Sequence, residues 1–301
     1  MRPQLLNAVA LLQNDDRDSI DEAIRLMQNT VYSFSMKVCG HPEDAEDTMQ
    51  EVLMRSLPHL ARIKDPRALA VWLYTVTRNR CWRMRRPTAG APRTMLSLDE
   101  LMPNDTELGL MLEHDAASPE QNVLSGEQGQ LIQDAVLGLP PKYRIALVLH
   151  DMEDLDTEEV AKVLGLNTGT VRVRLHRARL AMRKAMALMA QSAAGPMAAQ
   201  PVRVHNGHKT QTSKSRPAAC KELFANLSEY VDGRVEPQTC EQMRNHIEAC
   251  PACVAFLRDL RTAIDRCKKL DVPCDEQVSQ RLRTLLTREY MRLIDAPAAS
   301  K

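Results

Sequence analysis

Aromatic side chains are scarce in this chain, whose 301 residues include 2 Trp, 5 Tyr and 3 Phe. β-Strands favour aromatic and β-branched residues, so this scarcity, in a chain rich in Leu, Ala, Arg and Met, predicts an all-α protein. The chain also lacks any run of about 18 apolar residues, the length that crosses a bilayer. Its first residues do not form the apolar core of a signal peptide, so we expect a cytoplasmic protein without membrane contact.

The sequence patterns of catalysis are missing as well. There is no Gly-rich phosphate-binding loop, no Ser/His/Asp arrangement and no pair of carboxylates in an apolar setting. We therefore expect a binding protein rather than an enzyme. Cysteine is present at 8 positions, and in a reducing compartment these thiols indicate a metal site or redox chemistry rather than a disulfide framework.

Changes in composition divide the chain into segments. Residues 18–86 and 126–190 are rich in helix formers and predict two helical domains, joined by a proline-containing linker at 87–125. Residues 191–217 have too little apolar content to fold and predict a flexible tether. A Cys-rich helical domain follows at 218–270, and the tail at 271–301 has apolar residues spaced for one more helix, namely Val278, Leu282, Leu285 and Leu286.

A helix-turn-helix pattern lies between residues 151 and 183. Asp156 and Glu159 are spaced as a capping box, and Gly165 suits the end of the helix that they begin. Asn167 or Thr168 can cap the second helix, whose apolar residues Val171, Leu175, Ala178 and Met182 form one stripe. The rest of the second helix is basic, as in a helix that enters the major groove of DNA. The alternative is a solvated charged helix in a bundle.

Three stretches of this region resemble region 4 of extracytoplasmic-function sigma factors: residues 139–144 (LPPKYR), 160–166 (VAKVLGL) and 169–179 (GTVRVRLHRAR). That region reads the promoter element near −35. The family often has Ser where this chain has Val173, which changes one possible contact. The resemblance implies a DNA-reading surface made of Arg172, Arg174, His176, Arg177 and Arg179. We expect Arg172 and Arg177 to reach bases, and Arg174 and Arg179 to reach phosphates.

The N-terminal helical segment combines an acidic and a basic stretch. Residues 43–51 carry five acids and no base, whereas residues 78–86 carry five bases and no acid. This layout suits separate contacts with a basic protein surface and a nucleic acid.

Residues 44–52 (DAEDTMQEV) and 70–80 (AVWLYTVTRNR) resemble region 2 of the same sigma family. The resemblance implies that the acidic helix binds the β′ clamp helices of core RNA polymerase through Asp44, Asp47, Gln50 and Glu51. It also implies recognition of the melted −10 element, with a flipped base, by Arg62, Lys64, Arg67, Arg78, Asn79 and Arg80. The alternative is a free-standing helix-turn-helix regulator with a zinc or redox module, which does not need the acidic helix.

A metal-ligand pattern occupies the Cys-rich segment: Cys220, then 25 residues, His246, three residues, Cys250, two residues and Cys253. Three thiolates and one imidazole make a closed tetrahedral site for one structural Zn²⁺. A thioredoxin-like dithiol, or a zinc-dependent thiol enzyme, is a less favoured alternative because no βαβ pattern surrounds the Cys-x-x-Cys. A redox switch, with Cys240, Cys267 and Cys274 as further thiols, stays open beside a permanent metal staple.

Residues 227–233 (LSEYVDG) and 246–253 (HIEACPAC) resemble the zinc-binding anti-sigma domain. In that family the domain clasps sigma regions 2 and 4. Because it is joined here in cis, the resemblance implies an intramolecular contact, which could inhibit, activate or only stabilise. The sequence thus predicts an all-α sigma factor with regions 2 and 4 and a small fused zinc-binding domain that regulates it.

Overall fold

The computed structural model describes residues 3–14, 16–60, 65–83, 95–103, 107, 126–193 and 227–295. Within these ranges the regular structure is helical, without strands. None of the helices found there is long and apolar enough to cross a membrane. The helices are α1 (Pro3–Leu11), α2 (Arg17–Cys39), α3 (Pro42–Leu60), α4 (Pro66–Arg83), α5 (Leu98–Leu101), α7 (Gly126–Leu137), α8 (Pro141–Leu147), η3 (Val148–Met152, a π-helical turn), α9 (Thr157–Leu164), α10 (Thr168–Ala193), α12 (Pro237–Ala249), α13 (Pro251–Lys269) and α14 (Glu276–Asp295).

The chain forms two compact units, and each is assembled from segments that are separated in the sequence. Unit 1 comprises residues 1–94, 136–174 and 268–301, and unit 2 comprises residues 95–135 and 175–267. The division falls within the long helix α10. The first turns of this helix therefore belong to unit 1 and the remainder to unit 2.

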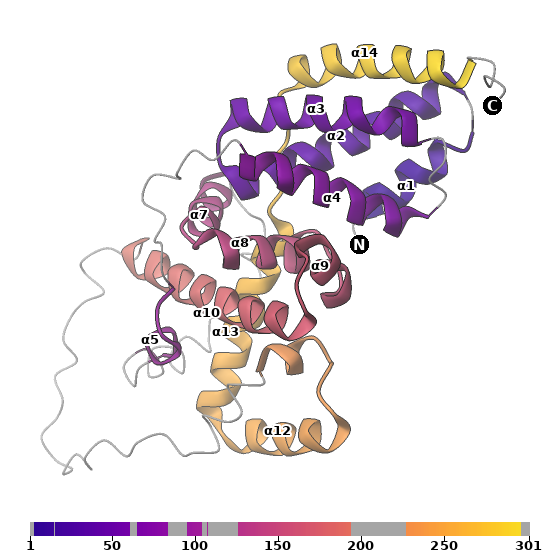
Figure 1. Cartoon of the computed structure of the whole chain (residues 1–301). Helices are drawn as coiled ribbons and strands as arrows, with labels where there is room; N and C mark the ends of the chain where they lie inside the picture. Colours follow the sequence, from indigo (N-terminus) through magenta and orange to yellow (C-terminus); the bar gives the residue numbers. More distant parts are fainter. Residues whose placement is uncertain are drawn as a thin grey trace, which may run out of the picture. The chain divides into compact units, whose positions relative to one another are not determined.

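Unit 1 is built around α2, which contacts α1, α3, α4 and α14 (Figure 1). Asp16 caps the start of α2 by accepting a hydrogen bond from the N–H of Ser19 at 2.9 Å. Gly40 ends the helix in the left-handed conformation, with φ at 81°. This left-handed conformation favours glycine, and a Cβ at Gly40 would also lie 2.8 Å from Leu137 Cδ1 and displace that side chain.

A buried ion pair joins α2 to the turn before α9 inside unit 1. Lys37 Nζ lies 3.0 Å from Glu153 Oε1, and both side chains are 0% exposed. The Tyr74 hydroxyl on α4 donates to the other carboxylate oxygen of Glu153 at 2.7 Å. Charges taken out of water must be paired and hydrogen-bonded, so these three residues fix the relative position of their elements.

Arg144 on α8 is a second buried cation in unit 1. Its guanidinium donates to the carbonyl oxygens of Val38 at 2.7 Å, of Leu139 at 3.0 Å and of Leu137. Val38 and Leu137 lie in the last turns of α2 and α7, where carbonyl groups lack helical partners. Burial lowers the pKa of Arg144 to about 10, which leaves it cationic at neutral pH.

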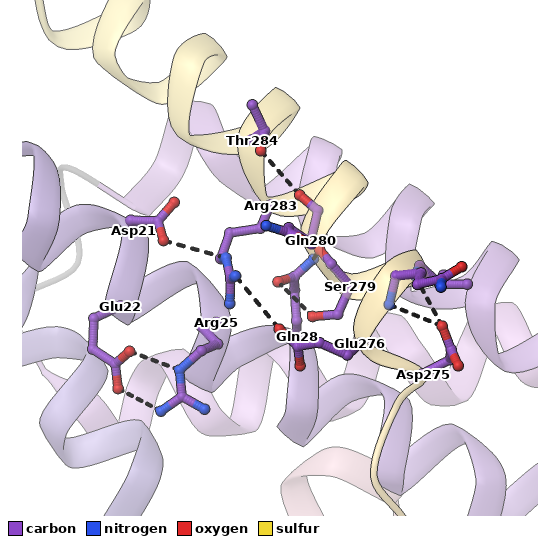
Figure 2. A network of polar contacts seen from close by, with 12 residues as sticks. Asp21, Glu22, Arg25, Gln28, Asp275, Glu276, Ser279, Gln280, Arg283 and Thr284 are labelled. Atoms are coloured by element: carbon purple, nitrogen blue, oxygen red, sulfur yellow. Dashed lines mark hydrogen bonds and ion pairs between the residues drawn. The ribbon is translucent and has the colours of Figure 1, made fainter.

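Helix α14 lies along α2 and α3, although it comes from the far end of the sequence (Figure 1). Figure 2 shows polar contacts that hold it there. Arg283 Nε lies 3.2 Å from Asp21 Oδ2 on α2, and the Gln28 amide donates to the Ser279 carbonyl at 3.1 Å. Thr287 Oγ1 and Asp21 Oδ1 are also hydrogen-bonded, at 2.9 Å. Two buried apolar residues, Leu286 and Tyr290, complete this face of α14.

Unit 2 has its own apolar core, shared by α5, α10, helical residues 227–231, α12 and α13. Its buried members are Leu101, Leu180, Leu227, Met243, Ile247, Cys253, Phe256, Leu257, Leu260 and Ile264. The second part of α10 is therefore packed within the same core as the Cys-rich helices.

Candidate functional site

The predicted helix-turn-helix is formed by α9 and α10. Asp156 and Glu159 make both hydrogen bonds of the expected capping box at the start of α9. Gly165 ends this helix in the left-handed conformation with φ at 65°. The side chain of Asn167, rather than that of Thr168, caps α10 by accepting from the N–H of Thr170 at 2.7 Å. These local signals fix the tight turn between α9 and α10.

The first turns of α10 present a basic outer surface. The predicted apolar stripe is buried, while Arg172 and Val173 are exposed and Arg174 is partly exposed. Arg177, one turn farther on, is also partly exposed. Three of the five predicted DNA-reading residues, Arg172, Arg174 and Arg177, thus lie at least partly exposed on this part of the helix, with Val173 between the first two.

The next turns of α10 contact the anti-sigma-like residues of unit 2. His176 Nδ1 lies 3.0 Å from Ser228 Oγ, and Arg179 pairs with Asp232 at 2.7 Å while only 2% of its side chain is exposed. Burial, helped by the nearby charges of Arg179 and Arg177, lowers the pKa of His176 to about 4. His176 is therefore neutral at pH 7, and both His176 and Arg179 contact residues 228–232.

The acidic helix α3 exposes only part of the predicted polymerase-binding set. Asp47 and Gln50 are exposed, whereas Asp44 is buried. Glu51 pairs with Arg55 at 2.8 Å and with Arg80 on α4 at 2.7 Å. The Asp47 carboxylate and the Gln50 amide are thus exposed, whereas the Glu51 carboxylate is already paired with two arginines of residues 18–86.

The predicted −10 residues that the structure describes lie near the two ends of α4. Arg62 and Lys64 lie outside the described residues, and Arg67 is exposed near the start of α4. Arg78 donates to the Val163 carbonyl of α9 at 2.6 Å and to Asn79 Oδ1 at 2.6 Å. Because Arg80 is paired with Glu51, the three basic-stretch residues Arg78, Asn79 and Arg80 all have contacts within unit 1.

Three of the four predicted metal ligands come together between α12 and α13. The ligand atoms of His246, Cys250 and Cys253 lie within 4.8 Å of one another. Cys253 Sγ and His246 Nε2 are 3.5 Å apart, which matches the separation of about 3.6 Å expected for two ligands of a tetrahedral zinc ion. The residues present therefore fit zinc, and the fourth predicted ligand, Cys220, lies outside the described residues.

Local structure explains this convergence. His246 and Cys250 are four residues apart at the end of α12, so they face the same side. Pro251 then starts α13, and the N–H of Cys253 donates to the Cys250 carbonyl at 2.9 Å. The tight turn brings the second thiol back toward the first.

Family models match three parts of the chain. A model of sigma-70 region 2 matches residues 23–89, a model of sigma-70 region 4 matches residues 129–182, and a zinc-finger model matches residues 220–253. The RNA polymerase sigma-E factor of Streptomyces avermitilis is 30% identical over 171 residues, which are 54% of this chain and 83% of the relative. The chain belongs to the extracytoplasmic-function family of RNA polymerase sigma factors.

Further relatives carry the same family name. The ECF RNA polymerase sigma factor SigW of Bacillus subtilis is 26% identical over 184 residues, which cover 61% of this chain and 97% of SigW. The ECF RNA polymerase sigma factor SigE of Mycolicibacterium smegmatis is 33% identical over 169 residues, covering 56% of this chain and 62% of the relative. Sigma factors are transcription initiation factors rather than catalysts. This sigma factor also carries a zinc-finger domain after its region 4.

Some partners in this sigma factor were not predicted from the sequence. Arg183 is basic like its neighbours, yet it is 1% exposed and lies over the Phe256 ring at 5.0 Å, with Asp259 at 3.5 Å. Asp232 belongs to the 227–233 stretch that resembles the anti-sigma domain, and the resemblance alone does not indicate an ion pair. The available signal was the acid beside Gly233 at the end of a helical stretch, and spacing alone could not show which arginine it meets.

The additional thiols of the sigma factor lie in different surroundings. Cys240 and Cys267 are in unit 2, with Cys267 buried, whereas Cys274 is in unit 1. Burial raises the pKa of Cys274 to about 11, helped by Glu46 and Asp275. The thiolate is the reactive form, so Cys274 is poorly suited to oxidation at neutral pH.

Proposed function

We propose that this sigma factor binds core RNA polymerase, directs it to a promoter and helps to melt the −10 element. The observation that carries the proposal is the presence of regions 2 and 4 in one chain, with an exposed acidic surface on α3 and an exposed basic surface on α10. A free-standing helix-turn-helix regulator would need only the second surface. Region 2 thereby adds a surface that can bind polymerase.

The polymerase contact is assigned to Asp47 and Gln50, with Asp44 and Glu51 supporting them. The partner is the β′ clamp helices, and opposite charge on the two surfaces favours the encounter. Asp47→Lys reverses the exposed charge without breaking an internal pair that Glu51→Lys would break. Asp18→Lys is the matched control because it makes the same charge change at an exposed position of α2. Co-purification with core enzyme should fall for Asp47→Lys alone; equal recovery of both variants would rule out this surface.

Promoter DNA is assigned to two sets of residues. Arg62, Lys64, Arg67, Arg78, Asn79 and Arg80 act at the −10 element, where flipping a base out of the duplex exposes its pairing edge. At the −35 element, Arg172 and Arg177 reach bases and Arg174 reaches a phosphate. His176 and Arg179 join this surface only when their contacts with Ser228 and Asp232 open.

The zinc-finger domain is proposed to bind one Zn²⁺ through Cys220, His246, Cys250 and Cys253. The ion would supply a closed tetrahedral crosslink that stabilises a domain with a small core. Purified protein should contain one equivalent of zinc, and Cys250→Ser should lose it. Cys240→Ser is the control, since Cys240 lies outside the ligand cluster. A metal content that is equal in wild type and Cys250→Ser would exclude this ligand set.

We further propose that the zinc-finger domain restrains transcription in cis. Support comes from the Arg179–Asp232 pair and the His176–Ser228 contact, which engage side chains assigned to DNA. Asp232→Ala should release Arg179 and raise promoter-dependent transcription by the full-length protein. Asp265→Ala, an exposed acid on α13, is the control. Transcription that is unchanged or lower in Asp232→Ala would mean that the contact stabilises rather than restrains.

A further inference from the structure

The outer surface of α10 has an apolar side chain at its centre. Val171, Leu175, Ala178 and Met182 form the buried stripe of this helix. At 3.6 residues per turn, Val173 lies on the side of the helix opposite to that stripe. It is 58% exposed, more than any other large apolar side chain among the described residues. Its isopropyl group therefore contributes little to the core of unit 1.

The surroundings of Val173 are basic. Arg172 is exposed beside it, while Arg174 and Arg177 are partly exposed. Single exposed apolar residues are common on proteins, but Val173 is the sixth residue of α10. In helix-turn-helix proteins, the N-terminal part of this second helix contacts base edges. An apolar group at this position therefore faces the floor of the major groove when the arginines contact DNA.

The major groove offers one prominent apolar group, the C5 methyl of thymine. Polar base edges offer hydrogen bonds, which a valine side chain cannot make. Accepting the proposed −35 contact of α10, on which the inference rests, we propose that Val173 is a specificity-determining residue that reads a thymine methyl in the −35 element. Arg172 is its neighbour along the helix, where the rise is about 1.5 Å per residue. The thymine therefore lies within two base pairs of the base that Arg172 contacts.

The experiment uses holoenzyme made from core polymerase and the full-length chain. Its preferred −35 sequence is first selected from promoter fragments randomised at that element. Each thymine is then replaced singly by deoxyuridine, which lacks only the C5 methyl. For wild type, one replacement should weaken binding about fourfold, which is about 0.8 kcal/mol, the value of one buried methyl or methylene group. That position should lie within two base pairs of the one where Arg172→Ala relaxes base preference.

Val173→Ser should bind the thymine and deoxyuridine promoters equally well, whereas Val173→Ile should keep the discrimination. Both substitutions are at an exposed position, and unchanged thermal unfolding verifies that the fold is intact. The proposal is wrong if no deoxyuridine replacement changes wild-type binding by more than twofold, or if Val173→Ser retains the fourfold loss. Failure of the holoenzyme to select any −35 sequence would instead refute the proposed function, and this inference with it.

Discussion

At the scale of single residues, the buried Lys37–Glu153 ion pair should make the stability of unit 1 sensitive to the loss of either partner. Both side chains are fully buried, and Tyr74 supplies a third polar group. Lys37→Met should lower the free energy of unfolding by about 3–5 kcal/mol, because it leaves the Glu153 charge buried without its cation. Trp72 and Trp82 both lie on α4 and report urea unfolding by fluorescence. The double variant Lys37→Met/Glu153→Met should recover most of the loss, and equal losses in single and double variants would contradict a buried charge pair.

His176 gives a second prediction at this scale, about pH. Its pKa of about 4 in the folded protein lies below the unfolded value of about 6.5. The unfolded state therefore binds more protons between these values, and the stability contributed by neutral His176 is lost as pH falls through about 6.5 toward 4. The amide hydrogen-exchange protection of α13 should correspond to roughly 1–2 kcal/mol less stability at pH 5 than at pH 8.

The same pH comparison on His176→Gln isolates the histidine. Asp259, whose pKa is raised by burial, titrates in both proteins and cancels in the difference. Protection in His176→Gln should change less with pH than protection in wild type. An identical pH dependence in the two proteins would show that His176 keeps an ordinary pKa.

At the scale of elements, the buried side of α14 differs in part from the apolar side that its sequence predicted. The sequence predicted a helix with Val278, Leu282, Leu285 and Leu286 on its apolar side. The helix is present, yet Leu286 is 0% exposed and Leu285 is 38% exposed. The buried side includes Ser279 and Thr287, which are hydrogen-bonded to Gln28 and Asp21. Partners on α2 decide which row is buried, and the pattern within α14 contains no information about them.

Two adjacent leucines therefore should behave differently. Leu286→Ala should lower the stability of unit 1 by about 2–5 kcal/mol, as expected for a buried leucine. Leu285→Ala is the matched control and should have a much smaller effect, because its side chain stays partly in water. Urea unfolding followed by tryptophan fluorescence measures both. Equal losses would show that α14 is not packed on α2 through this row.

Some elements were predictable from local signals because their determinants lie close together in the sequence. The capping box of Asp156 and Glu159, the turn at Gly165 and the convergence of His246, Cys250 and Cys253 are of this kind. The burial of Arg144 could not be predicted, because its carbonyl partner on Val38, 106 residues away in the sequence, is brought to it by tertiary packing. Arg179 likewise has the sequence pattern of a solvent-facing arginine, because its partner Asp232 is 53 residues away in the sequence.

At the scale of the whole molecule, the chain combines a sigma factor with a zinc-finger domain that engages part of the proposed DNA-reading helix. Regions 2 and 4 are proposed to confer promoter-specific initiation, and the C-terminal part is proposed to restrain it. Both statements can be tested on one template set, because a chain ending at Met189 keeps the matched sigma regions, which extend to residue 182. That chain also loses α14, so its urea unfolding is measured alongside, and full-length Asp232→Ala, which keeps α14, is assayed on the same templates.

Run-off transcription with core polymerase, with RNA 5′ ends mapped, is the most direct measurement. Core enzyme alone should give no promoter-specific start, whereas core enzyme with either the full-length chain or the chain ending at Met189 should start at the same defined position. The shorter chain should give the higher yield, because His176 and Arg179 lose their partners Ser228 and Asp232. If neither chain produces a defined start with zinc present, the assignment of function is contradicted.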